Sequence, residues 1–293
     1  MTTARALLIF VLAAATGVTT AMDESIITIG ASPSRFEVEV GNRPVNEALK
    51  IFNYGRETAR IQVSVNSWTL DERNEVQVTA PTEQSLDQWM IVSPMAFEVA
   101  PGSFQTVRFS IRPRVEPAPG EHRAMIYLQQ QPTRDVVDGK TIDVIGRVGV
   151  AVYAYVGDVE RVGQLHDVQV QPDGELQLAS FDISSIGSAH VRMSGQYTIW
   201  PADLYTVDEG EESGDESATG NDLVLPEGAL SVGWLPPSPV LPDARRRLPM
   251  RFGQDLPAGD YVLDVRGDLA GAPLRMGIPF SISDATSEEI VSN

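Results

Sequence analysis

Apolar and polar residues alternate along most of this chain of 293 residues, and this period of two constrains its fold more than any other feature. Alternating runs occur at residues 61–65, 107–111, 261–265 and 274–280. Alternation places every second side chain on one face, which is typical of a half-buried strand. Pro-Gly and Asp-Gly pairs separate the runs, and no amphipathic helix is evident beyond the N-terminal segment. The sequence therefore predicts an all-β fold built from antiparallel sandwiches.

The first 21 residues have the pattern of a secretion signal. Arg5 precedes an apolar run at residues 6–15, which is too short to span a bilayer, and small residues continue to Ala21. The alternative is an N-terminal anchor that is retained. We predict cleavage after Ala21 and export. No later segment has the apolar length of a membrane span, so membrane insertion is not expected.

Composition excludes several classes of function. The chain has no cysteine and only three histidines, which lack the spacing of metal ligands, so we expect neither a metal nor another cofactor. The formal net charge is −18, which argues against nucleic acid as a partner. A hydrolase that uses two carboxylates is a further alternative, but no spacing among the 40 acidic residues singles out a pair.

The two halves of the chain share an order of turns and strands. Turns at residues 100–102 and 118–120 precede strands in the first half, and turns at 241–243 and 256–259 do so in the second. The pattern suggests two sandwiches of one type. The predicted division is a signal peptide at 1–21, a first domain at 22–157, a second domain at 158–285 and a tail at 286–293.

Residues 208–222 are acidic and almost free of apolar side chains. They cannot offset their ordering entropy by burial, so we expect a solvated loop of the second domain. A calcium site is the alternative, but the spacing lacks the pattern of an EF-hand. The basic run at 245–247 is interpreted as a solvated strand entry, and no role is assigned to it.

The segment from Lys140 to Val156 is the longest run of strand-forming residues, and it would extend over roughly 50 Å at ~3.3 Å per residue. If alternation holds, Ile142, Val144 and Val148 share one face. Two interpretations are open. A sheet edge here could donate backbone hydrogen bonds and apolar side chains to a partner that lacks a strand. Alternatively, an ordinary internal strand bridges the two domains, and the pattern alone favours this second interpretation.

Several motifs resemble those of the PapD-like periplasmic chaperones of the chaperone–usher pilus system, and the chain looks like a divergent member. These motifs are SPSR at 32–35, QVSV at 62–65 followed by Trp68, SPMAFEVAPGSFQTVR at 93–108 and GRVGVAVY at 146–153. The run from Pro94 to Arg108 is the most specific of them. The resemblance covers essentially the whole predicted mature chain.

The resemblance implies two immunoglobulin-like domains joined in an L shape, with a carboxylate site in the cleft between them. In that family, two basic residues hold the C-terminal carboxylate of a pilin-like subunit. Arg35 matches the first of these. Gly149 stands where the second, a lysine, is expected, and Arg147 lies two residues earlier on the same face. Arg147 is either the replacement anchor or a solvated strand residue.

The predicted function is that of a periplasmic chaperone. It would bind pilus or fimbrial subunits by donor-strand complementation through Ile142, Val144 and Val148, anchor them through Arg35 and Arg147, and deliver them to an outer-membrane usher. It is not expected to be an enzyme. The sequence leaves open the client and whether the free protein dimerises to cap its strand. The rival is a secreted structural or adhesive protein with two immunoglobulin-like domains and no client.

Overall fold

The computed structural model describes residues 28–131, 133–137, 140–206 and 223–283, and over 133–144 the description covers only the backbone. The predicted signal peptide 1–21, acidic loop 208–222 and tail 286–293 lie outside the described residues. Within the described ranges, strands form nearly all of the regular structure and the one helix is a single turn. The all-β prediction is confirmed.

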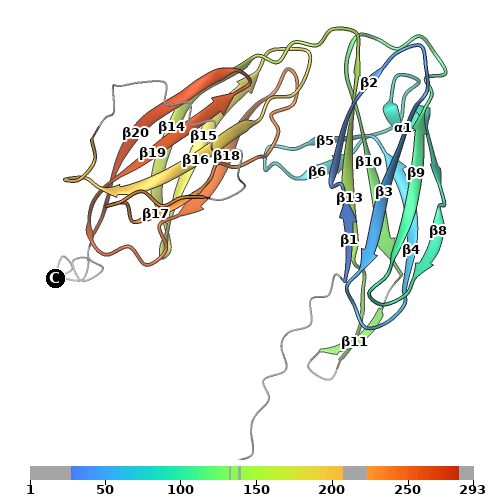
Figure 1. Ribbon diagram of the computed structural model, residues 1–293, viewed down its shortest axis with the longest axis horizontal. Helices are drawn as coiled ribbons and strands as arrows, with labels where there is room; N and C mark the ends of the chain where they lie inside the picture. Colours follow the sequence, from blue (N-terminus) through green and yellow to red (C-terminus); the bar gives the residue numbers. More distant parts are fainter. Residues whose placement is uncertain (1–27, 132, 138–139, 207–222, 284–293) are drawn as a thin grey trace, which may run out of the picture.

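The strands form two separate sandwiches (Figure 1). The first contains β1 (Ile29–Ser32), β2 (Arg35–Val40), β3 (Val45–Asn53), β4 (Ala59–Asn66), β5 (Trp68–Leu70), β6 (Val76–Val78), α1 (Leu86–Trp89), β7 (Met90–Ser93), β8 (Ala96–Val99), β9 (Phe104–Ile111), β10 (Gly120–Gln130) and β13 (Arg147–Val156), with β11 (Thr133–Val137) and β12 (Lys140–Val144) forming a hairpin between β10 and β13. The second contains β14 (Gly163–Asp173), β15 (Leu176–Ser185), β16 (Met193–Pro201), β17 (Ser231–Trp234), β18 (Arg245–Phe252), β19 (Gly259–Leu269) and β20 (Ala272–Ile282).

The first sandwich packs a four-stranded sheet against a five-stranded sheet. The strand orders are β1-β3-β9-β7 and β2-β13-β10-β4-β8. Alternation on β9 buries Val107, Phe109 and Ile111 and leaves Arg108 exposed, as the period of two predicts. The single turn α1 adds the buried Trp89 to the same core. This core fixes the position of the five-stranded sheet, which carries the candidate site.

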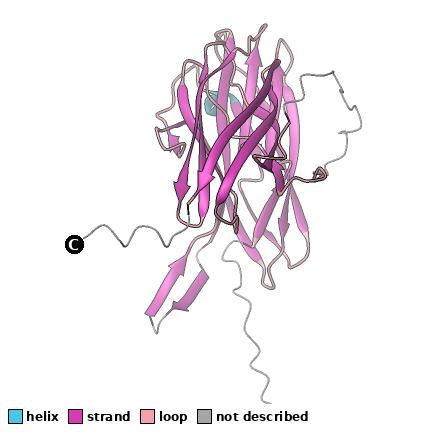
Figure 2. Ribbon diagram, turned by 90° about the vertical axis from the view of Figure 1, so that its left-hand side faces the viewer, coloured by secondary structure: helices cyan, strands magenta, loops and turns pink. Residues whose placement is uncertain are grey.

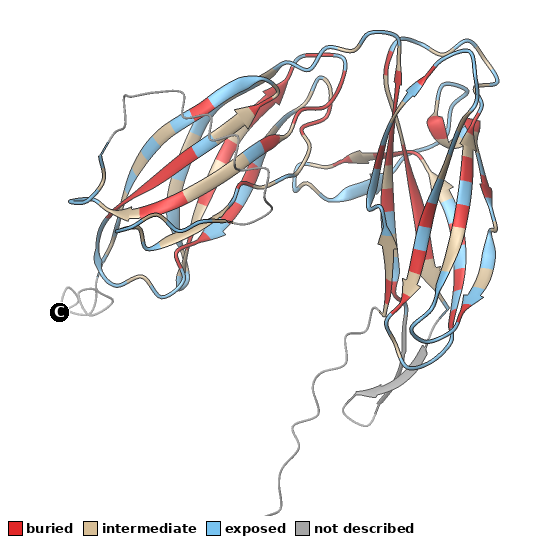
Figure 3. Ribbon diagram, viewed as in Figure 1, coloured by how far each residue is buried: buried red, intermediate tan, exposed pale blue. Residues whose placement is uncertain are grey.

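The second sandwich packs β14-β15-β18 against β17-β16-β19-β20. Phe181, Leu248, Leu263 and Val265 are completely buried between the two sheets. Figure 3 shows buried residues recurring along the strands of both sandwiches, with a separate core in each. No helix of the described residues is long and apolar enough to cross a membrane.

The two immunoglobulin-like sandwiches meet at an angle, as the predicted L shape requires (Figure 1). They are joined at one end by the segment that follows β13. The β5–β6 hairpin leaves the first sandwich and reaches toward the second. The β11–β12 hairpin projects from the opposite end of the first sandwich (Figures 1 and 2).

The run of strand-forming residues from 140 to 156 forms two strands in the structure. The strand breaks at Ile145 and Gly146, so that β12 pairs with β11 in its own two-stranded sheet. Gln129 pairs with Arg147, and Thr133 pairs with Val144. Between these two pairs, the three residues 130–132 therefore lie opposite the two residues 145–146. Such an extra residue disrupts a ladder, and glycine is a weak strand former.

Candidate functional site: a free strand edge beside an interdomain cavity

One edge of β13 is only partly covered. Along its whole length β13 pairs with β10, but on its other side β2 covers only Ala151 to Val156. Arg147 to Val150 therefore have no partner strand on that side among the described residues. The same holds for β12, whose described partner is β11 alone. We call residues 140–150 the free edge.

The course of the first strand explains why this edge is free. β1 pairs with β3 in the four-stranded sheet, and the chain then passes through Pro33 and Ser34 to the other sheet, where β2 begins at Arg35. Proline has no N–H to donate to a ladder, so the crossing interrupts pairing at this point. Because β2 starts opposite Ala151, the preceding part of β13 stays uncovered.

Side chains along the free edge differ in direction. Val150 is buried and Val148 is half-buried against the first core, so both face the protein's own interior. Arg147 is exposed, and its guanidinium lies over the ring of Tyr127 at 3.6 Å. Ile145, at the break, is 52% exposed. The free edge thus offers mainly its backbone between Arg147 and Val150.

Only the backbone is described for the two predicted apolar contacts on β12. Ile142 pairs with Asp135 and Val144 pairs with Thr133 across the β11–β12 hairpin. Both residues therefore lie in a strand whose other side has no described partner. Their role as side chains that fill a partner's groove stays a prediction.

A cavity of about 320 Å³ lies where the free edge ends, and residues of both domains line it. Its lining consists of Ser34, Arg35, Trp68, Leu70, Asn74, Val76, Met125, Ala151, Tyr153, Arg192, Ser238 and Pro239. The charged residues in this lining are two arginines, and Glu37, which pairs with Arg35, is not part of the lining. In a chain with a net charge of −18, two cations facing one cavity indicate a site for an anion.

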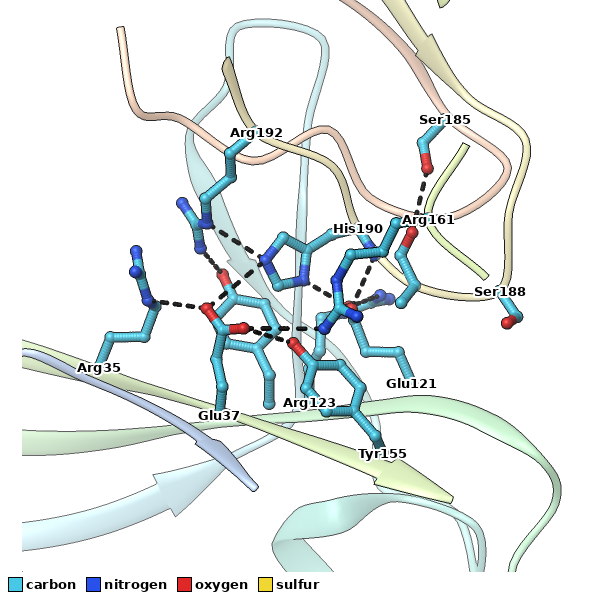
Figure 4. A network of polar contacts seen from close by, with 12 residues as sticks. Arg35, Glu37, Glu121, Arg123, Tyr155, Arg161, Ser185, Ser188, His190 and Arg192 are labelled. Atoms are coloured by element: carbon cyan, nitrogen blue, oxygen red, sulfur yellow. Dashed lines mark hydrogen bonds and ion pairs between the residues drawn. The ribbon is translucent and has the colours of Figure 1, made fainter. Parts of the chain in front are cut away.

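The two arginines reach the cavity from different domains. Arg35 is the first residue of β2, and its Nε lies 3.0 Å from Glu37 Oε1. The side chain of Arg35 is 46% exposed. Arg192 precedes β16 in the second domain and donates to the Tyr153 hydroxyl at 2.9 Å. Figure 4 shows the two guanidinium groups on the same side of a polar network.

This network joins the two domains through a buried acid and a buried histidine. Glu121, on β10, accepts hydrogen bonds from His190 Nδ1 at 2.6 Å and from Arg123 Nη1 at 2.9 Å. The side chains of Glu121 and His190 are 0% and 3% exposed. The Glu121 backbone N–H also donates to the Ser188 carbonyl. These bonds fix the relative position of the domains beside the cavity.

Environment shifts the pKa of three groups in the network. Burial raises the pKa of Glu121, but the hydrogen bonds from His190 and Arg123 outweigh burial, and the pKa lies below its ordinary value. Burial raises the pKa of the Tyr153 and Tyr155 hydroxyls, and the hydrogen bond to Glu37 adds to the shift of Tyr155. Both tyrosines therefore stay neutral hydrogen-bonding groups at neutral pH.

Apolar and backbone contacts complete the joint. Trp68, Met125 and Tyr153 of the first domain form one buried cluster with Ala189 and Leu241 of the second. The guanidinium of Arg246 donates to the carbonyl oxygens of Leu70 and Asp71 at the tip of the β5–β6 hairpin. The second of the three arginines at 245–247 is thus an interdomain contact, which the interpretation as a solvated strand entry did not anticipate.

The structure brings Arg35 to the cavity but not Arg147. Arg35 pairs with Ala151, and Arg147 lies four residues earlier on β13, which is roughly 13 Å along the strand. At Gly149, an added Cβ would lie 2.9 Å from Met125 Sδ, so the Met125 side chain occupies this place. The role of Arg147 as the second anchor stays a prediction.

Sequence reasoning missed Arg192, His190 and Arg246. No local signal marks them, because each acts through contacts with residues far away in the chain. Nothing in the spacing of the run from Gly187 to Arg192 indicates a cavity. Among the described residues, no group of three or more acidic or histidine side chains could hold a metal ion.

Several solved structures of pilus chaperones are similar to this chain. The YadV chaperone is 9% identical, with 87% of this chain and 100% of that chain covered and a TM-score of 0.42. The CsuC–CsuE chaperone–tip adhesion subunit complex of Acinetobacter baumannii is 13% identical, with 86% and 97% covered and a TM-score of 0.41. The Escherichia coli chaperone DraB is 16% identical, with 88% and 96% covered and a TM-score of 0.40.

No protein-family model matches the sequence, and no curated protein matches it. These three structures are of the class that the sequence motifs resemble. At identities and TM-scores this low the similarities carry no functional argument, so function has to be inferred from the geometry of the chain itself.

Proposed function

We propose that this protein is a chaperone that holds a secreted subunit of the pilus or fimbrial kind by adding a strand to it. It is a binding protein that needs no cofactor, not an enzyme. The observation that carries the proposal is the free edge, which ends at a cavity lined by two arginines. An unpaired edge of this length is an aggregation hazard unless a partner uses it.

The free edge can supply a ladder of hydrogen bonds. Residues 140–150 extend over roughly 35 Å at ~3.3 Å per residue, enough for an added strand of ordinary length. Each backbone hydrogen bond contributes about 0.5–1.5 kcal/mol net. Apolar contacts therefore have to add to the ladder, and we propose Ile142 and Val144 for this role. Val148 faces the protein's own core and contributes through its backbone.

The position of Arg35 sets the direction of the added strand. A strand lying along the free edge has to stop where β2 begins, because β2 already occupies the edge from Ala151 onward. The end of that strand then lies beside Arg35. A guanidinium binds a carboxylate through two parallel hydrogen bonds, so the end it selects is the C-terminus. The client strand therefore runs parallel to β13.

Location and partners complete the proposal. We place the mature protein in the periplasm, on the basis of its signal-like N-terminus and the motif resemblance. The bound subunit would pass to an outer-membrane usher. In the absence of a client, pairing of two free edges in a dimer would protect the exposed backbone.

Capture from periplasmic extract of the native host tests the proposal. Tagged mature protein is compared with Arg35→Ala and with the control Arg60→Ala, which removes an exposed arginine paired with Glu98 at 2.8 Å on the same domain. We expect the wild type and Arg60→Ala to retain the same small secreted subunit, and Arg35→Ala to lose it. Recovery that is equal for the wild type and Arg35→Ala, or absent for both, favours a structural or adhesive protein without a client.

A further inference from the structure

The carboxylate site is divided between the two domains, because Arg35 comes from the first and Arg192 from the second. We infer that Arg192 is the second guanidinium of this site, so that binding of a chain-terminal carboxylate is coupled to the joint between the domains. This inference rests on the proposed function and concerns a residue that neither the sequence motifs nor the alternation indicated.

Arg192 is held in place by three hydrogen bonds. Its Nε donates to His190 Nε2 at 3.1 Å, its Nη2 to the Tyr153 hydroxyl at 2.9 Å and its Nη1 to the Pro237 carbonyl at 2.7 Å. A guanidinium has five N–H groups, so two remain for a ligand. Fixed geometry of this kind lowers the entropy that is lost when an anion binds.

The charge of Arg192 has no direct counter-ion among the described residues. All three of its hydrogen-bond partners are neutral groups, whereas Arg35 is paired with Glu37. The Glu37 carboxylate contacts His190 Nε2 at 4.0 Å rather than Arg192, so an anion bound by Arg192 would supply the direct counter-ion that this partly buried cation lacks. A bound carboxylate is therefore stabilised mainly by its interaction with the charge of Arg192.

The apolar residues that line the cavity indicate what kind of molecule carries the carboxylate. Trp68, Leu70, Val76 and Met125 line it together with the two arginines. A small inorganic anion would leave this apolar surface unused. A polypeptide that ends in an apolar or aromatic residue would cover it, with its terminal carboxylate between the guanidinium groups.

His190 connects the cavity to the interdomain joint. Because its Nε2 accepts from Arg192, the ring proton lies on Nδ1, which donates to Glu121 Oε2 at 2.6 Å. A chain of polar contacts thus runs from Glu121 in the first domain through His190 to Arg192 (Figure 4). A ligand that binds Arg192 in this position stabilises the joint. By thermodynamic reciprocity, a change that loosens the joint lowers the affinity for the ligand.

Two synthetic peptides test the site directly. Both are acetylated, alternate threonine and valine and end in phenylalanine, one as the free acid and the other as the amide. Binding to the mature protein is measured by calorimetry or by the change in tryptophan fluorescence. We expect the acid to bind the wild type about tenfold to a hundredfold more tightly than the amide, the factor expected for charge-assisted hydrogen bonds.

Four variants separate the role of Arg192 from a general loss of structure. Arg192→Gln should abolish the preference for the acid and Arg192→Lys should retain part of it. Arg60→Gln removes an exposed arginine of the first domain that does not line the cavity and should leave the preference unchanged. Glu121→Gln loosens the joint without changing a residue that lines the cavity. It should lower the affinity for the acid peptide several-fold and the affinity for the amide peptide less.

Spin labels measure the joint itself. The chain has no cysteine, so the exposed positions Thr58 and Glu175, one in each domain, can be labelled after Thr58→Cys and Glu175→Cys. The distance distribution between the labels should broaden in Glu121→Gln and narrow when the acid peptide is added. An unchanged distribution in both experiments would overturn the coupling.

The outcomes also separate this inference from the proposed function. If the wild type prefers the acid, Arg35→Ala loses the preference and Arg192→Gln keeps it, the role of Arg192 is wrong and the chaperone proposal stands. If the wild type binds both peptides equally, or neither at millimolar concentration, the inference is wrong. The chaperone proposal is then decided by the capture of a subunit from extract.

Discussion

Glu121 shows how much of the joint depends on one buried carboxylate. It accepts from His190 and Arg123 within the network, and its own backbone N–H binds Ser188 of the second domain. A buried charge is tolerated only while it is paired, since removing one partner leaves the other without compensation. A single substitution at Glu121 is consequently expected to weaken the contacts between the two domains directly.

Replacing Glu121 with Gln should lower the free energy of unfolding by roughly 3 kcal/mol at pH 7, the lower end of the range for breaking a buried ion pair. The amide keeps the shape of the side chain but removes its charge. Urea unfolding followed by fluorescence measures the difference. A loss in the free energy of unfolding of ~1 kcal/mol or less, the contribution of an exposed ion pair, would show that the Glu121 ion pair does not stabilise the joint.

The same variant tests how the contribution of Glu121 to the free energy of unfolding depends on pH. The pKa of Glu121 in the folded protein is lower than its ordinary value of 4.5. The stability it contributes is therefore complete above pH 4.5 and is lost as the pH falls through the lower folded-state pKa. The wild type and Glu121→Gln should thus converge in stability in acid. A stability difference that is the same at pH 7 and at about pH 3 would contradict this prediction.

At the scale of the elements, the decisive feature is a hairpin that continues past its sandwich. β10 and β13 run together through Gln129 and Arg147, and β11 and β12 continue the hairpin beyond the break. The backbone of the projecting part pairs with no other described strand. The outer backbone edge of β12 is accordingly available to a partner strand.

Substituting both Ile142→Asp and Val144→Asp should abolish client binding and leave the fold intact. Two charges on β12 oppose burial in a partner's apolar groove, while the first core lies in the sandwich, away from the hairpin. Capture of the subunit and the melting temperature are measured together. A large fall in melting temperature would show that these side chains belong to the protein's own core and would refute the donor role.

Over the whole molecule, several independent contacts connect the two sandwiches. The apolar cluster around Trp68 and Tyr153, the Glu121 network and the contacts of Arg246 all cross between domains. Asn74 adds a hydrogen bond to the Arg247 carbonyl at 2.9 Å. With this many independent contacts, the two domains are expected to unfold together.

Adjacent arginines provide a test of that cooperativity. Arg246→Ala removes the contacts to the β5–β6 hairpin and should reduce coupling between the domains by about 2 kcal/mol, within the range for hydrogen bonds from a charged group, separating one calorimetric transition into two. Arg245→Ala removes an exposed pair with Asp182 inside the second domain. Surface pairs of this kind contribute ~1 kcal/mol or less, so one transition should remain. Identical behaviour of both variants would contradict a coupled joint.

The alternation of apolar and polar residues was sufficient to predict the class of fold. Residues such as Val107, Phe109 and Ile111 are buried where the period of two places them, because burial of one strand face is a local property of the sequence. Arg35 was likewise identified from its motif and lies at a cavity. The strand-forming run from Lys140 to Val156 is divided at Ile145 and Gly146, and the sequence of this run alone could not show where, since a mismatch between paired strands depends on both strands.

The sequence by itself determined which residues form strands, which faces those strands bury and that Arg35 stands at the start of one of them. The tertiary structure decided where strand pairing stops and which side chains meet at the cavity. Arg192, Tyr153 and Arg35 come together only because two domains are packed at a particular angle. Contacts between residues so far apart in the chain arise from that packing, and no local pattern of residues encodes them.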